Sequence, residues 1–549
     1  MSSIVKTKNF KQFVIDGREV PFANVDHCLP DDRAMCLSSG KWSMVVRAPQ
    51  PPLVGILDCL NKTRYGFTAK NVPIYLFQPM NKAYPPFRVG STIEPTQNYL
   101  VVIQYETWEL TQSMPRGSLI QTLGPVGDFE AEASALYWLY SPWTGYTKKT
   151  SAYAPPEFDV TDRVEIRADH GWQTFNVDPD GCRDIDDCFS YVWDEYGQMA
   201  QCAITIADVA ALVEEGSPID KLARKAGQSL YQDGKPPRHM LPATVTEDYG
   251  SLSPGDLRLG ITLFFDYDRM TNFIDNIHFK ETTIQNQTQY TYDSIKDSAH
   301  ASLLKNLCRK LTPETSTDNT DDPHNWIAAL MIFYNTEFAH YIYGSPAGIL
   351  RAHKGPDLKK QEMLEAIDPD LKFLAMSSAV YVPATTENAR HHGLDADFYT
   401  HASSPLRRYA DLHNQRVFKE IYHEKQERPA EKELLETLNQ LAKHAKKYER
   451  DFGFLQAFFS SESKVIAGTI VDIKQKDTTV RIEIWIPEWK RIIKVSYAGT
   501  VNETKDGALI TSRDEKTTHT IAIKQNVELA FSYDSSKAYW KERMVYRLL

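Results

Sequence analysis

The chain has 549 residues, enough for several domains, and its 42% hydrophobic content can build real cores. Its net charge of −10 excludes a basic protein that coats duplex nucleic acid, so any nucleic-acid contact must lie in a local groove or channel. The seven cysteines form no CxxC pair, which argues against disulfide scaffolds and zinc knuckles. The sequence shows no signal-peptide core and no apolar run of about 18 residues, so we expect a cytoplasmic monomer without a membrane partner.

The N-terminal part divides into a weakly patterned start and a strand-rich region. Residues 1–40 show little pattern, so we treat them as an N-terminal extension and assign no elements to them. From residue 41 to about 127, short strands such as KWSMVV and YLVVIQYETW alternate with Pro-rich turns, which predicts a small β-barrel. GDFEAEASALYWLY is typical of a helix, and the Pro/Ser/Tyr-rich stretch after it predicts a linker over about 141–158.

The middle of the chain, about residues 160–428, mixes strands and helices. YVWDEYGQMAQCAITIADVAALV indicates a strand hairpin that leads into a turn, and residues 325–343 indicate a buried helix. Apolar residues at helical spacing from Leu434 to Ala445 predict an amphipathic helix over residues 430–450, which we interpret as a structural strut.

The tail, residues 462–549, returns to short strands and predicts an OB-type barrel. Basic and aromatic residues alternate in it: Lys474, Lys476, Arg481, Trp485, Trp489, Lys490 and Arg491. Such a surface can stack bases and neutralise the phosphates of single-stranded nucleic acid, although basic residues are also common on the solvent face of any strand.

The stretch FNVDPDGCRDIDDCFSY, which begins at Phe175, is dense in carboxylates. It carries Asp178, Asp184, Asp186 and Asp187, with Asp180 among them. Acids this close repel one another unless a cation lies between them, and hard oxygen ligands suit Mg²⁺ or Mn²⁺. The apolar Ile185 and Phe189 favour a loop anchored in a core, while a solvated acidic turn stays an open alternative at this point.

A second polar cluster lies at residues 399–416, YTHASSPLRRYADLHNQR. It combines two serines, a proline and two adjacent arginines. Arginine grips phosphate in a bidentate manner and stabilises charge that develops on a phosphoryl centre. Metal ions held by acids, together with a positioned arginine, are the usual equipment for phosphodiester hydrolysis.

These two segments resemble motifs of the RNase II/RNase R (RNB) exoribonucleases, including the Dis3-like members. The first resembles DxxDxxDxDD and the second resembles YTHFTSPIRRYxDL. Between them, ITIADVAALVEEGSPID resembles HIADVSxYVxxGSxLD, AGQSLYQDG followed by RHMLP resembles RxxSVYLxxxxIPMLP, YGSLSPGDLRLGITL resembles CSLxPxxxRLAxS, and ILRAHKGPD resembles LYRVHExPD. The resemblance covers roughly residues 45–549.

The resemblance implies a multidomain α+β fold. It would consist of a cold-shock/OB-type β-barrel region at 41–158, a mixed α/β RNB catalytic domain at 159–428, a helical connector at 429–461 and a C-terminal OB-type β-barrel at 462–549. Both barrel regions would bind RNA.

The resemblance also implies a hydrolytic 3′→5′ exoribonuclease that degrades single-stranded RNA to nucleoside 5′-monophosphates with Mg²⁺, or Mn²⁺, as cofactor. The implied roles are metal binding by Asp178, Asp184 and Asp187, the chemical step by Asp186, contact with the scissile phosphate by Arg407, stacking on the 3′-terminal nucleotide by Tyr231, and shaping of the pocket by Arg408, Ser403 and Ser404.

Several alternatives stay open in the sequence. Arg408 could instead form a buried ion pair with Asp411, and Tyr231 could be a core residue. Ala328 and Ala329 stand where family members often carry acids, although Asn335 remains, so a contact to the RNA end is either missing or supplied elsewhere, for example by Glu337. The competing functions are a catalytically inactive RNA-binding protein on a decayed nuclease scaffold and a metal-dependent DNA nuclease or phosphatase. The retained acids argue against the inactive protein, and the flanking barrels argue against the DNA nuclease or phosphatase.

Overall fold

The computed structural model of the chain contains two compact units. It describes residues 2–61, 63, 65–143, 146, 153–154, 156, 160–232, 235–312, 319–429, 431–476, 478–504, 507–512 and 518–549. One unit comprises Met1–Thr144, Met363–Leu371 and His444–Leu549, and the other comprises Gly145–Glu362 and Lys372–Lys443. Most of the predicted linker at 141–158 lies outside the described residues. None of the helices in the described ranges is both long and apolar enough to span a membrane.

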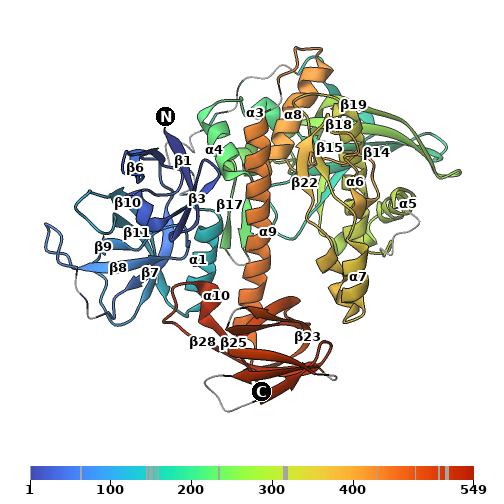
Figure 1. Cartoon of the computed structure of the whole chain (residues 1–549). Coiled ribbons are helices and arrows are strands. Elements are labelled where there is room, and N and C mark those ends of the chain that lie inside the picture. Colours follow the sequence, from blue (N-terminus) through green and yellow to red (C-terminus); the bar gives the residue numbers. More distant parts are fainter. Residues whose placement is uncertain are drawn as a thin grey trace. The chain divides into compact units, whose positions relative to one another are not determined.

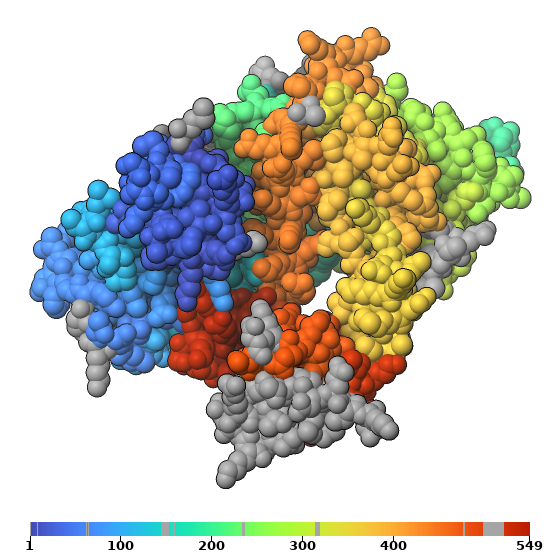
Figure 2. Space-filling model, in the orientation of Figure 1, coloured from blue at the N-terminus to red at the C-terminus, as the bar shows by residue number. Residues whose placement is uncertain are grey.

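The first unit begins with a sheet of order β3-β2-β1-β5-β6-β4. Its strands are β1 (Ser3–Asn9), β2 (Gln12–Ile15), β3 (Arg18–Pro21), β4 (Val25–Asp26), β5 (Arg33–Cys36) and β6 (Trp42–Val46). The N-terminal extension of residues 1–40, to which the sequence pattern assigned no elements, therefore contains strands. Asp16 and Gly17 both have positive φ in the turn between β2 and β3, the Asp-Gly signature of a two-residue hairpin turn. Figure 2 shows this sheet in dark blue beside the lighter blue barrel strands.

The predicted small barrel follows and is confirmed as a closed barrel of order β10-β11-β9-β8-β7, although the strand KWSMVV, which was assigned to it, is β6 of the preceding sheet. Its strands are β7 (Leu53–Asp58), β8 (Ile74–Pro79), β9 (Phe87–Gly90), β10 (Tyr99–Thr107) and β11 (Arg116–Pro125). The predicted helix is α1 (Phe129–Tyr140), which begins where the Asp128 carboxylate accepts a hydrogen bond from the Ala131 N–H. Closure leaves no free sheet edge, so the short strands are stable without covering layers.

The C-terminal part of the same unit is a sheet of order β27-β26-β25-β24-β23-β28-β29, the barrel-like sheet predicted for residues 462–549. Its elements are β23 (Val465–Lys476), β24 (Thr479–Ile486), β25 (Arg491–Thr504), β26 (Gly507–Ser512), β27 (Thr518–Ile521), β28 (Asn526–Tyr533), α10 (Trp540–Arg543) and β29 (Met544–Leu548). The interpretation of Trp485 and Trp489 as base-stacking residues was wrong, because both are buried. The Trp489 ring packs against Phe458 and Phe531, where it stabilises the core.

The second unit is built on a mixed sheet of order β12-β19-β18-β15-β14-β13-β20. Its strands are β12 (Val164–Ile166), β13 (Gln173–Val177), β14 (Asp187–Trp193), β15 (Met199–Ala207), β18 (Leu257–Asp268), β19 (Phe273–Gln285) and β20 (Thr288–Tyr290). The predicted hairpin is confirmed as the antiparallel pair β14 and β15. Two small hairpins complete the unit: β16 (Leu230–Gln232) with β17 (Lys235–Arg238), and β21 (Ile349–Ala352) with β22 (Val380–Pro383).

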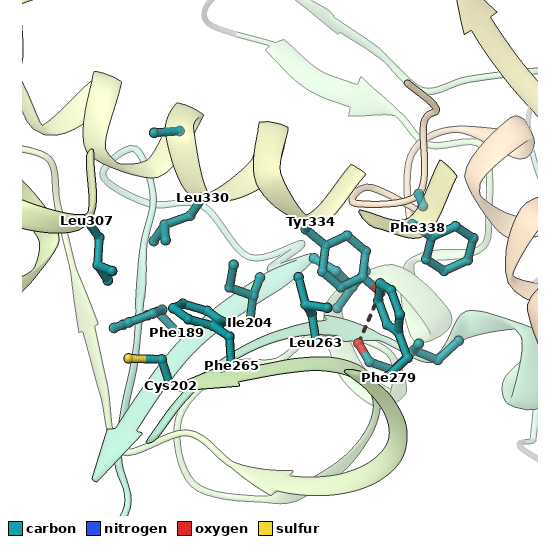
Figure 3. Packing of buried hydrophobic residues seen from close by; sticks show 14 of the residues in the cluster. Phe189, Cys202, Ile204, Leu263, Phe265, Phe279, Leu307, Leu330, Tyr334 and Phe338 are labelled. Carbon is teal, nitrogen blue, oxygen red and sulfur yellow. Dashed lines mark hydrogen bonds between the residues drawn. The ribbon is translucent and has the colours of Figure 1, made fainter. Parts of the chain in front are cut away.

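Helices in this unit cover the sheet and form its core. They are α3 (Val209–Leu212), α4 (Pro218–Ala226), α5 (Ala301–Leu311), α6 (Pro323–Ile342) and α8 (Tyr409–Tyr422). Two further helices, α7 (Leu358–Glu365) and α9 (Lys432–Ser460), each have residues in both units. The predicted buried helix is α6, which lies across β15 and β18 in Figure 1. Leu330, Tyr334 and Phe338 of α6 face the sheet in Figure 3, and the Tyr334 hydroxyl donates a hydrogen bond to the Ile261 carbonyl at 3.1 Å. The predicted amphipathic helix is α9, which extends beyond residue 450.

Helix α8 is held in the second unit by buried polar contacts. His413 Nε2 donates to the Ala347 carbonyl at 2.9 Å, and Asn414 Oδ1 accepts the Ile349 N–H at 3.0 Å. Arg416 forms an ion pair with Asp220 at 2.8 Å. These contacts fix the position of the helix that directly follows the two arginines of the second motif.

Protonation of His413 should destabilise this unit in acid. Burial lowers the pKa of His413 from 6.5 to about 4, so the unfolded chain binds a proton that the folded chain refuses between these pH values. Stability should therefore fall as the pH drops from about 6.5 to about 4, by about 3 kcal/mol in total for this group. Urea unfolding of the wild type and His413→Gln over this range should show a steeper pH dependence in the wild type. Equal slopes would contradict the prediction.

A buried ion pair should stabilise the first unit. Glu132 and Arg543 are almost completely enclosed, their side chains are 2.5 Å apart, and the Tyr533 hydroxyl also donates to Glu132. Glu132→Ala leaves a buried guanidinium without a charged partner, so we expect a loss of about 3–5 kcal/mol in the free energy of unfolding, measured by thermal or urea unfolding.

The matched control for Glu132→Ala is Glu542→Ala, which removes the exposed partner of Lys82 in the same unit. Its effect should stay below about 1 kcal/mol, because solvent screens exposed pairs. Similar losses for the two variants would refute a special contribution of the buried pair.

Candidate active site

The acidic segment forms the connection between two neighbouring strands of the second unit. Strand β13 ends at Val177, directly before Asp178, and β14 begins at Asp187. Ile185 is fully buried, and its N–H donates to the Ser251 hydroxyl at 3.1 Å. The same hydroxyl donates to the Arg183 carbonyl at 2.7 Å. The loop is thus anchored in the core, as Ile185 predicted, and is not a freely solvated turn.

Asp186 joins the two motifs of the sequence. Its Oδ1 accepts a hydrogen bond from the Leu406 N–H at 2.9 Å, and its Oδ2 accepts one from Arg407 Nε at 3.1 Å. The side chain is only 5% exposed. Burial raises the pKa of Asp186 to about 7, although Arg407 and the Leu406 N–H act in the opposite direction. Asp186 therefore holds the arginine segment against the acidic loop.

The other three acids of the loop influence one another electrostatically. Burial raises the pKa of Asp178, with a further increase from Asp184, while the Asn176 amide donates to its carboxylate at 2.9 Å. The pKa of Asp187 is raised well above its usual value by burial, then by Asp178 and by Asp186. A cation among these carboxylates would favour their ionised forms.

The chemistry of this donor set fits a hard divalent cation, because its ligands are carboxylate oxygens. Within the described ranges, no group of three or more acidic, histidine or cysteine side chains is already arranged around one point as a metal site. Metal binding by Asp178, Asp184 and Asp187 therefore stays a prediction.

Arg407 is anchored at one end and accessible at the other. Its Nη2 donates to the Ser404 hydroxyl at 2.8 Å while Nε contacts Asp186, and 45% of the side chain is exposed. Burial alone would lower the pKa of Arg407, but the Asp186 carboxylate outweighs that effect and raises it. A permanently charged and oriented guanidinium of this kind can contact a phosphate without losing its anchor.

Arg408 and the two serines mainly hold the turn before α8. Arg408 donates to Asp411 at 2.8 Å, which confirms the ion pair considered from the sequence, and Asp411 also accepts the Ser404 N–H. The Ser403 hydroxyl accepts a hydrogen bond from Asn335 at 3.0 Å. Contacts of Arg408, Ser403 and Ser404 with RNA stay predictions.

Tyr231 lies on β16 at the acidic loop. Its hydroxyl donates to Asp184 Oδ2 at 2.5 Å, and 46% of the residue is exposed. The alternative of a core tyrosine was therefore wrong. A half-exposed ring held by a carboxylate has a free face that can stack on a nucleobase.

Helix α6 contributes to the site through Asn335. This residue is 2% exposed, and its amide contacts Tyr399, the Ala402 N–H and Ser403, so it fixes the segment that precedes the two arginines. Ala329 is buried in the core of the unit, where a glutamate would lack a partner. Glu337 is half-buried, and burial raises its pKa.

Two further residues, Asn176 and Ser251, position the acids but were not identified in advance. The motif YGSLSPGD contains Ser251 and could have drawn attention to it. Asn176 lies two residues before Asp178 at the end of β13, so both side chains lie on the same face and form a hydrogen bond.

Comparison with known proteins identifies two regions of the chain. The RNB domain matches residues 167–307 and 298–424, and the Dis3-like cold-shock domain 2 matches residues 74–141. The "Exosome complex exonuclease dis3" of Schizosaccharomyces pombe is 25% identical over 450 residues, which are 66% of this chain and 46% of that protein. The chain thus spans about half the length of this curated relative.

Solved structures share the fold of the whole chain. The RNase R of Mycoplasma genitalium in complex with ribose-methylated single-stranded RNA superposes with a TM-score of 0.68 at 17% identity, covering 100% of both chains. The yeast protein Ssd1, described as a pseudonuclease, has a TM-score of 0.64 at 15% identity and covers 99% of this chain and 83% of its own. The predicted α+β fold with OB-type and RNB regions is confirmed. The chain therefore carries an RNB domain preceded by a Dis3-like cold-shock domain 2, and it is similar in sequence to the Dis3 exonuclease and in fold to RNase R.

Proposed function

We propose that this protein is a hydrolytic 3′→5′ exoribonuclease that degrades single-stranded RNA to nucleoside 5′-monophosphates. The observation that supports the proposal most strongly is the placement of Asp186 between the Leu406 N–H and the Arg407 guanidinium. This contact brings an acidic loop and a phosphate-binding side chain into one site. The polarity and the product follow from similarity to the family and not from the geometry.

Each side chain in the proposed reaction has a task that its contacts explain. Arg407 would bind the scissile phosphate and stabilise the charge that develops on it. Asp186 would orient Arg407 through the hydrogen bond between them. Since Asp186 belongs to the acidic loop, the loss of its charge would affect both the loop and the arginine segment. Tyr231 would stack on the terminal base, with its hydroxyl held by Asp184.

Asp178, Asp184 and Asp187 would hold Mg²⁺ or Mn²⁺. When bound, the metal would supply Lewis-acid stabilisation of the phosphate and lower the pKa of a water molecule. The raised pKa values of Asp178 and Asp187 support the proposal, since they indicate carboxylates whose charge lacks compensation. Residues outside the loop, such as Asn176, keep these acids oriented.

A second candidate function is a non-catalytic RNA-binding protein. The similarity in fold to Ssd1, described as a pseudonuclease, favours this candidate, because the same architecture occurs without nuclease activity. All four aspartates are retained, together with Arg407, which favours the enzyme.

One assay separates these functions. A single-stranded RNA labelled at its 5′ end is incubated with the protein and Mg²⁺ or Mn²⁺, and in parallel with EDTA. Stepwise shortening from the 3′ end, only with metal, supports the exoribonuclease. Intact RNA under every metal condition, with binding retained, supports the RNA-binding protein, and an equally rapid loss of a DNA of the same sequence refutes RNA specificity.

Asp186→Asn should abolish most of the cleavage. The amide keeps the size of the side chain but loses the charge that orients Arg407, so we expect a fall in kcat of roughly 10²–10³-fold with RNA affinity nearly unchanged. Single-turnover cleavage and filter binding in EDTA measure the two quantities. Asp180→Asn is the matched control, because it removes an exposed acid of the same loop. Activity of Asp186→Asn within about tenfold of the wild type would show that the essential acid is misassigned.

A further inference from the structure

One buried arginine of the second unit lacks an ion-pair partner. Among the described residues, three arginines are more than nine-tenths buried: Arg351, Arg416 and Arg543. Arg416 pairs with Asp220 at 2.8 Å, and Arg543 pairs with Glu132 at 2.5 Å. Within the described part of the chain, Arg351 has no carboxylate at ion-pair distance, and its Nη1 is fully enclosed without a hydrogen-bond acceptor.

An unpaired buried charge is costly, so proteins pair such groups or use them to bind a ligand. Arg351 is 4% exposed, and desolvation lowers its pKa. Its Nη1 is enclosed, so water does not reach all of the five guanidinium donors. This nitrogen therefore lacks a negatively charged hydrogen-bond acceptor.

The surroundings of Arg351 are aromatic and cationic. Arg351 is the register partner of Tyr381 across the β21–β22 hairpin, and its guanidinium carbon lies 4.3 Å from the centre of the Tyr381 ring. The Tyr381 hydroxyl is 2.8 Å from His401 Nδ1. The Arg351 N–H donates to the Tyr399 carbonyl at 2.7 Å, which fixes the strand beside the second motif.

The charges around this position are predominantly positive. The pKa of His401 is held well below its usual value by burial, then by Arg408, Arg351 and Arg407. Arg408 also lowers the pKa of Arg351. The acid that acts on Arg351, Asp411, is engaged through its Oδ1 by Arg408 and by the Ser404 N–H, and it is not at ion-pair distance from Arg351. A phosphate would supply the missing negative charge and would accept hydrogen bonds from the guanidinium.

We propose that Arg351, with Tyr381 and His401 beside it, binds a backbone phosphate of the RNA that is different from the phosphate held by Arg407. The identity of the ligand rests on the proposed function. A phosphodiester of bound RNA and the phosphate of a released mononucleotide share the same chemistry, and we assign the subsite to the diester. The subsite contributes to the affinity for RNA and to the position of the RNA strand in the site, and it does not act in bond cleavage.

The first test measures RNA binding in EDTA. Arg351→Gln should lower the affinity for single-stranded RNA about tenfold, the size of one charge-assisted hydrogen bond. The slope of log affinity against log salt concentration should become shallower by about 0.7, the value for one phosphate contact on a single strand. Arg351→Lys should keep most of the slope. Arg390→Gln is the control, because Arg390 is an exposed arginine of the same unit that is paired with Asp395 and Asp397.

The second test locates the phosphate. A set of RNAs carries one neutral methylphosphonate linkage each, at successive positions from the 3′ end. At one position, the methylphosphonate should lower the affinity of the wild type for the RNA. The same methylphosphonate should not lower the affinity of Arg351→Gln, because this variant already lacks the contact. Competition with inorganic phosphate and with a nucleoside 5′-monophosphate separates the two sources. If Arg351→Gln weakens binding of the mononucleotide and leaves RNA binding unchanged, the assignment to the diester is refuted.

A purely structural role for Arg351 would give a different result. Removal of an unpaired buried charge should leave the Tm of Arg351→Gln unchanged or higher, whereas Arg416→Gln, which breaks an ion pair, should lower it. A lowered Tm together with unchanged RNA affinity and salt slope overturns the proposal. RNA binding is measured without metal and does not depend on cleavage. A lower RNA affinity of Arg351→Gln therefore supports the subsite even if the wild type cleaves no RNA. The absence of cleavage by the wild type would refute only the exoribonuclease.

Discussion

The arrangement of the site depends on one buried carboxylate. Asp186 accepts hydrogen bonds from the Leu406 N–H and from Arg407, two residues that lie more than two hundred positions later in the chain. Both contacts are charge-assisted and lie in an environment with little water, where such bonds are stronger than at the surface. Without this carboxylate, the Arg407 guanidinium would keep only the Ser404 hydroxyl as its anchor. The loop between β13 and β14 and the turn before α8 are therefore one structural entity.

The charges of the site are incompletely balanced in the protein alone. Burial and mutual repulsion raise the pKa of Asp178 and Asp187 in the acidic loop. Arg351, which Arg408 influences electrostatically, has a buried Nη1 without an acceptor. An excess of negative charge suits a cation, and an excess of positive charge suits a phosphate, so both imbalances fit a site for metal-assisted phosphodiester chemistry. Arg416 and Asp220 of the same unit, in contrast, neutralise each other.

Elements with a strong local pattern were predictable. Helix α6 and the hairpin of β14 and β15 occur where apolar periodicity indicated them, because their residues pack on one continuous core. The sheet of residues 3–46 was missed, since its strands are short and each buries at most two apolar residues, such as Phe13 and Ile15 of β2. Trp485 and Trp489 were misinterpreted because their basic neighbours suggested a binding surface. Trp485 near the end of β24 and Trp489 in the turn after it are both buried, and tertiary packing decides this burial.

For the functional site, residue types and their order in the chain are sufficient to identify the acids, the arginine pair and the family. They are sufficient because carboxylates and guanidinium groups have few roles when they cluster in apolar surroundings. The fold decides which of these side chains contact one another. That Asp186 contacts Arg407, that Arg408 is occupied by Asp411 and that Arg351 has no acceptor all depend on contacts between distant segments. Burial and pairing arise only when helices and sheet pack together, and no local pattern in a single sequence encodes the distance between two such side chains.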